Sequence, residues 1–177
     1  MARPDGGGAD AAALAVTAAG GGVVASDAGA VAVAVGDGGA PPAPIVVDTN
    51  IALDLLVFAD PSWASLHAGL AAGALRWIAT PAMRAELARV LGYPLIARRL
   101  LRDARAPEAV LAAFDAVART VAAVPPRAPF VCKDTDDQMF IDLAVAHRAR
   151  LLSKDRAVLS MRKRLATLGV AVAPAFG

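Results

Sequence analysis

The sequence lacks the residues that several common kinds of site need. Cys132 is the only cysteine, which excludes an intrachain disulfide, and one cysteine with two histidines cannot supply a four-ligand Cys/His zinc site. No stretch of 18 or more large apolar residues occurs, so we expect no membrane span. Residues 11–26 are apolar, but acids precede them and glycines interrupt them, so we expect a cytoplasmic protein and no signal peptide.

Residues 1–40 have few large apolar side chains and instead contain 14 Ala and 10 Gly. Such a stretch buries too little area to offset the conformational entropy lost on ordering it. Three prolines in residues 41–44 then form a stiff spacer. We therefore expect residues 1–44 to be a low-complexity, disordered tail, or the product of a start codon assigned too far upstream. Residues 45–177 are long enough for one domain with a single core.

The net charge of +2 conceals an uneven distribution. Residues 1–40 carry one base and four acids, a net charge of −3, whereas the remainder carries 17 bases and 12 acids, a net of +5. The chain has 15 Arg and 3 Lys. The guanidinium fork binds phosphate bidentately, so this excess favours a phosphate-containing partner. A GC-rich genome would produce the same excess without any function, and both explanations stay open.

Short apolar runs alternate along the chain with segments of helical periodicity. Strands are expected at residues 45–47, 75–79, 151–153 and 170–172. Helices are expected at residues 51–58, 61–72, 81–91, 95–103, 107–121, 136–148 and 156–167. Strands separated by helices predict an α/β fold, with a central parallel sheet covered on both faces in three α/β/α layers.

Four acids stand where such a fold would bring them together. Asp48 ends the first strand, which reads as buried on both faces, and Asp155 follows the strand at residues 151–153. Asp137 lies at the start of a helix, and Glu86 lies on a helix that follows a strand. Because ligands of open α/β sheets bind outside the carboxyl ends of the strands, all four acids can converge at one edge.

Converging carboxylates favour a bound cation. Without one, their repulsion raises their pKa values. Oxygen ligands without Cys or His select a hard ion, Mg²⁺ or Mn²⁺, and such a site supports hydrolysis of phosphodiesters. Simpler explanations exist for single members, because Asp137 or Asp155 could cap a helix and Glu86 could be a surface acid. Asp48 is the hardest to explain in this way, because it ends a buried strand.

Over residues 45–173 the chain resembles the PIN-domain ribonucleases, and among them the bacterial toxin components of toxin–antitoxin pairs. The first motif of that family is similar to Val46-Val47-Asp48-Thr49-Asn50. The third is similar to Asp134-Thr135-Asp136-Asp137 with the apolar run after it, and the fourth to Leu151-Leu152-Ser153-Lys154-Asp155. Glu86 matches the family's second acid. Thr135 and Ala157 depart from the common pattern, but neither is at a ligand position.

The resemblance implies a metal-dependent ribonuclease. It implies Mg²⁺ or Mn²⁺ held by Asp48, Glu86, Asp137 and Asp155. Asn50 and Ser153 would orient the ligands or waters. Basic residues at the mouth would hold the RNA backbone, the candidates being Arg84, Lys154 and Arg156. A protein antitoxin and a homodimer are the expected partners beside RNA. Asp134 and Asp136 have no assigned role beyond capping or solvation.

Two alternatives stay open. One is a binding module that keeps the PIN-like fold without catalysis. The other is a response-regulator receiver, a parallel α/β domain that is phosphorylated on an aspartate. A receiver needs a pair of acids after the first strand and a lysine at the end of a late strand. Here only Asp48 follows the first strand, and Lys154 directly precedes Asp155.

Overall fold

The protein is described by a computed structural model, in which the described residues are 41–176. Residues 1–40 of the expected tail lie outside them. Ala43 and Pro44 belong to the first strand and pair with Leu75 and Arg76, so the expectation of disorder is wrong for the end of the tail. Five strands form one sheet in the order β3-β2-β1-β4-β5, and every neighbouring pair is parallel. The strands are β1 (Ala43–Val47), β2 (Leu75–Ala79), β3 (Ala118–Thr120), β4 (Arg150–Leu152) and β5 (Val172–Ala173). The prediction of a parallel sheet is confirmed.

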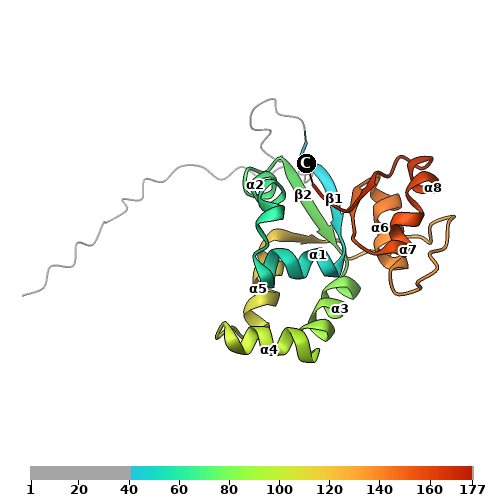
Figure 1. The fold of residues 1–177 in the computed structure, drawn as a ribbon. Helices are drawn as coiled ribbons and strands as arrows, with labels where there is room; N and C mark the ends of the chain where they lie inside the picture. Colours follow the sequence, from blue (N-terminus) through green and yellow to red (C-terminus); the bar gives the residue numbers. More distant parts are fainter. Residues whose placement is uncertain (1–40, 177) are drawn as a thin grey trace, which may run out of the picture. The chain divides into compact units, whose positions relative to one another are not determined.

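Helices cover both faces of this sheet. They are α1 (Thr49–Leu53), α2 (Ala64–Ala71), α3 (Pro81–Leu91), α4 (Pro94–Arg102), α5 (Pro107–Val117), α6 (Gln138–His147), α7 (Arg156–Ser160) and α8 (Arg162–Ala166). A π-helical turn, η1 (Asp54–Phe58), and a 3₁₀ turn, η2 (Pro61–Trp63), join α1 to α2. Figure 1 shows α1, α2 and α5 on one side of the sheet and α6, α7 and α8 on the other. The three-layer α/β/α prediction is confirmed. No helix within residues 41–176 is long and apolar enough to cross a membrane.

The strand order reverses between β1 and β4. From β1 the chain adds β2 and then β3 on one side, and it later adds β4 and β5 on the other. Val47 lies beside Leu152 in the register of the two central strands. The residues that follow these strands therefore meet at the same sheet edge, which is where parallel α/β sheets bind ligands.

The central strands are anchored in the core, which fixes the position of this edge. Ile45 and Val46 are almost completely buried, as the run of β-branched residues predicts for a strand covered on both faces. Trp77 of β2 meets Phe114 of α5 edge to face, with 5.2 Å between ring centroids. A well-packed sheet gives the side chains at its edge little freedom to move apart.

Several element boundaries differ from the prediction, and the largest differences are in three of the expected helices. Residues 118–120, expected to end a helix, form the edge strand β3, and the Val121 N–H donates to Ala79 O at 2.8 Å. Pairing with the exposed side of β2 outweighs the weak helical preference of this segment. The helix expected at 51–58 becomes π-helical after Leu53, and the one expected at 156–167 is interrupted at Met161.

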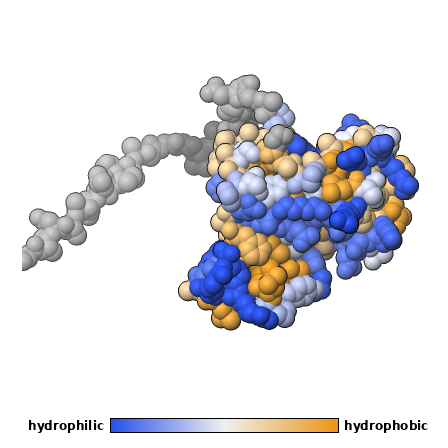
Figure 2. Space-filling view, in the orientation of Figure 1, coloured by the Kyte–Doolittle hydropathy of each residue, from blue (hydrophilic) through white to orange (hydrophobic). Residues whose placement is uncertain are grey.

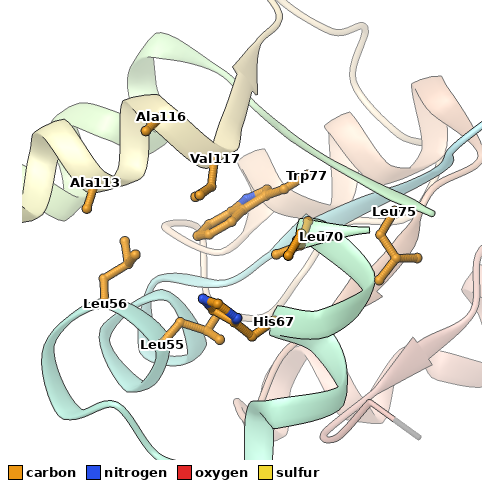
Figure 3. Close-up of a pocket in the computed structure, with 10 residues that line it drawn as sticks. Leu55, Leu56, His67, Leu70, Leu75, Trp77, Ala113, Ala116 and Val117 are labelled. Carbon is orange, nitrogen blue, oxygen red and sulfur yellow. The ribbon is translucent and has the colours of Figure 1, made fainter. Parts of the chain in front are cut away.

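An apolar cavity of about 480 Å³ lies among α2, η1, α5 and β2. Figure 3 shows Leu55, Leu70, Trp77 and Val117 around it, with the His67 imidazole among them. No carboxylate lines this cavity, so it is distinct from the edge at which the acids gather.

Candidate metal centre

Asp48 is a buried carboxylate at the end of β1, with 3% of its surface exposed. Its Oδ1 accepts the Asn50 N–H at 3.3 Å, and its Oδ2 accepts the Ser153 hydroxyl at 2.6 Å. Ser153 follows β4 and is completely buried. The hydroxyl thus fixes one carboxylate oxygen of Asp48, as the expected orienting role requires. The Asn50 side chain is exposed, and only its backbone contacts Asp48.

Asp155 is linked to Asp48 through the same serine. The Asp155 N–H donates to Ser153 Oγ at 3.0 Å. The Asp155 carboxylate accepts the Ala157 N–H at 2.6 Å and so caps α7. The simpler explanation of Asp155 as a helix cap therefore holds here, and it leaves one carboxylate oxygen available for another ligand.

Asp137 immediately precedes α6 but makes no capping hydrogen bond. Its Oδ2 is buried and has no hydrogen-bond partner within residues 41–176. Burial first, and then the negative charges of Asp48 and Asp155, raise the pKa of Asp137 from 3.8 to about 7. An unpartnered buried oxygen among like charges is the environment that a divalent cation would stabilise.

Asp48 is affected in the same direction. Burial raises its pKa, and the charge of Asp155 adds to this effect, whereas the hydrogen bond from Ser153 and the Asn50 N–H oppose it. Ser153 contacts both the Asp48 carboxylate and the backbone of Asp155, and Asp48 and Asp137 line one cavity. These contacts place the three acids at the β1–β4 edge, and their joint binding of a metal ion stays a prediction.

Glu86 faces the same site from α3. A cavity of about 360 Å³ is lined by Asp48, Asn50, Glu86 and Asp137 among other residues. The Glu86 carboxylate, however, is held by Arg89: Oε1 accepts from Nη2 at 2.7 Å, and Oε2 accepts from Nε at 2.8 Å. Glu86 thus lies in the site, but both of its oxygens are occupied.

The candidate ligand atoms are all carboxylate oxygens, which are the atoms that a hard divalent cation prefers. One of them, Asp137 Oδ2, has no other partner among the described residues. Within residues 41–176, no three Asp, Glu, His or Cys side chains are grouped closely enough to hold an ion together. Two carboxylates point to other partners, Glu86 to Arg89 and Asp155 to the Ala157 N–H. Both carboxylates would have to leave these partners before all four acids could hold one ion.

The three candidate RNA-contacting residues differ in their surroundings. Arg84 forms a bidentate ion pair with Asp115, at 2.6 and 2.7 Å, which ties α3 to α5. Lys154 pairs with Asp54 of η1. Arg156 is exposed and has no carboxylate partner within residues 41–176. Of the three, only Arg156 has its charge available for a phosphate in this conformation.

Sequence reasoning missed two polar residues that position the segment before Asp137. The Gln138 side chain accepts the Cys132 N–H at 2.6 Å and donates to Phe130 O at 3.2 Å and to Asp142 at 2.6 Å. Asp142 in turn accepts the Ala128 N–H at 2.9 Å. The available signal was two polar residues four positions apart within an otherwise apolar helical run.

Asp134 and Asp136 lie outside this buried network. The Asp136 N–H donates to the Asp134 carboxylate at 3.0 Å, which closes a tight turn ahead of α6. Both side chains are exposed. The expectation that one of them caps the helix is wrong, because no side chain caps the start of α6 and the Asp134 carboxylate accepts within the preceding turn.

The raised pKa of Asp137 predicts how the stability of the metal-free protein depends on pH. Because the folded protein binds more protons than the unfolded chain between the two pKa values, the free energy of unfolding falls as pH rises from 3.8 to about 7. The stabilising contribution of Asp137 is fully present below pH 3.8 and is lost above about pH 7. Urea midpoints in EDTA at about pH 5.5 and about pH 8 should show the fall for wild type and a smaller fall for Asp137→Asn. An equal fall in both proteins would assign it to another group.

A model of one protein family, the PIN domain, matches residues 44–157. That range is more than half of the chain and contains all four candidate ligands, Asp48, Glu86, Asp137 and Asp155. No curated protein matches the sequence. The parallel sheet, the acids at the β1–β4 edge and the family match agree with one another, and the chain belongs to the PIN-domain family.

Proposed function

We propose that this protein is an endoribonuclease that hydrolyses RNA phosphodiester bonds with Mg²⁺ or Mn²⁺. PIN domains are generally nucleases that act on RNA with divalent metal ions. The observation that carries the proposal is the buried, unpartnered Oδ2 of Asp137, beside the carboxylates of Asp48 and Asp155. Such a group is costly in a merely structural role and is accounted for if a cation shares it.

In this proposal Asp48, Glu86, Asp137 and Asp155 hold the cation. When bound, the ion would supply an activated water and would stabilise the leaving oxygen of the phosphodiester. Ser153 fixes Asp48 and also receives the Asp155 N–H, so one hydroxyl orients two candidate ligands. Because Asp137 is partly protonated near neutral pH without a cation, ion binding should release a proton.

RNA would approach over the exposed side of this edge. Arg156 directly follows Asp155 and is exposed, so it can meet a backbone phosphate near the acids. Arg84 and Lys154 would first have to leave Asp115 and Asp54. Contacts of this kind position a strand without reading its sequence.

A cleavage assay tests the proposal. Labelled RNA incubated with the full chain should be cut internally with Mg²⁺ or Mn²⁺ and left intact with EDTA. RNA binding without cleavage under every metal condition would favour a silent PIN-like binding module. The receiver alternative has no support from the structure, because Lys154 pairs with Asp54, not with the clustered acids.

We further propose that the protein is the toxin of a toxin–antitoxin pair, acts in the cytoplasm, and is restrained by a protein antitoxin. Support for protein partners, including a homodimer, comes from exposed apolar side chains on α4, where Leu95 is 75% and Leu101 79% exposed. Figure 2 shows apolar surface interrupted by polar patches in the region of α4.

Expression of this protein alone should slow growth, and co-expression of the antitoxin should restore it. An active nuclease that never slows growth would count against the toxin role only.

A further inference from the structure

One basic side chain lies among the acids of the candidate metal centre. Of the residues that line the 360 Å³ cavity, Arg89 is the only one with a positive charge. Its guanidinium binds both oxygens of Glu86 and also donates to the Tyr93 hydroxyl. The guanidinium carbon lies 5.3 Å from the centroid of the Tyr93 ring, so the aromatic ring supports it as well.

We propose that Arg89 is a positioning residue that competes with the divalent cation for the Glu86 carboxylate, and so sets how tightly the site binds its ion. The inference rests on the proposed function, in which Glu86 is a ligand. The two N–H groups of Arg89 occupy the oxygens that a cation would need. A guanidinium and a divalent ion on the same carboxylate would also repel each other at close range. Binding of the ion to Glu86 therefore requires this ion pair to open.

An ordinary surface pair is the simplest competing explanation, because Glu and Arg three residues apart on a helix often pair with little consequence. Two observations distinguish Glu86 from such a residue. Its side chain is only 22% exposed, and it lines one cavity with Asp48 and Asp137. Arg84, on the same helix, makes an equally close bidentate pair with Asp115, which does not line this cavity.

The test measures ion affinity in the absence of RNA. Arg89→Met keeps a long, unbranched side chain that suits a helix but removes the charge and the donors. A Mn²⁺ titration of the full chain at about pH 8, where Asp137 is mostly ionised, should show Mn²⁺ binding about 1.5- to 5-fold tighter than in wild type. Arg84→Met is the matched control, and its Mn²⁺ affinity should equal that of wild type.

Removing any positive charge near a cluster of acids could tighten ion binding, and a double-mutant cycle separates that effect from competition. In a Glu86→Gln background, competition for Glu86 predicts that Arg89→Met has no further effect. The same tightening in both backgrounds would overturn the proposal, as would wild-type affinity in Arg89→Met. If wild type binds no Mn²⁺, the proposed function itself fails. If wild type binds Mn²⁺ but Arg89→Met does not change the affinity, only the competition fails.

Discussion

Asp137→Asn should abolish metal-dependent RNA cleavage, lowering its rate by roughly 10²- to 10³-fold or more, and yet should not destabilise the metal-free protein. The unpartnered Oδ2 and the raised pKa show that the ionised carboxylate is costly in the folded state without a cation. A neutral amide removes that cost. In EDTA the melting temperature of the variant should therefore be equal to or higher than that of wild type. Asp48→Asn should lose cleavage equally but gain less stability, because its single amide oxygen can accept from Ser153 or from the Asn50 N–H but cannot replace both carboxylate oxygens.

Calorimetric melts with EDTA and with Mn²⁺ test this prediction. Mn²⁺ should stabilise wild type by linkage to the folded state and should stabilise Asp137→Asn much less. A helix-capping role makes the opposite prediction, a loss of about 0.5–2 kcal/mol whether or not metal is present. Asp136→Asn is the control, since Asp136 is adjacent and acidic but exposed. An equal Mn²⁺ shift in wild type and Asp137→Asn would remove Asp137 from the site.

Gln138→Ala should cost about 2–4 kcal/mol of unfolding free energy and should also reduce cleavage. The amide makes three hydrogen bonds, two of them to the chain at residues 130–132 and one to the buried Asp142. Removing the amide takes away the acceptor of the buried Cys132 N–H and one of the donors to the buried Asp142 carboxylate. Because the same chain leads directly into Asp137, loosening it should displace a candidate ligand as well.

Urea unfolding of Gln138→Ala and of Lys133→Ala provides the comparison, since Lys133 is exposed in the same segment and its loss should be nearly neutral. A loss below about 1 kcal/mol in Gln138→Ala would show that water replaces the amide and that the network is dispensable. A loss of stability with unchanged cleavage would separate the anchoring of this segment from the placement of Asp137.

The sequence by itself determined the architecture and the location of the acids. The three consecutive β-branched side chains at 45–47 favour a strand buried on both faces, and that strand places Asp48 at its carboxyl end. The same reasoning places Asp155 after β4, since alternating strands and helices leave few other topologies. Hydrophobic patterning is a local signal, so it was readable without the fold.

The tertiary structure alone decided how each polar group is engaged. Residues 118–120 became a strand because β2 offered unpaired backbone groups, which no local pattern reveals. Asp115 of α5 accepts from Arg84 of α3, and Lys154 pairs with Asp54, which lies 100 residues away in the chain. Ion pairs and orphaned oxygens depend on distances between segments far apart in the chain, and Coulomb energies change steeply over those distances. The charge state of the candidate metal centre is therefore set by the packed structure, whereas the sequence specifies only which acids are present.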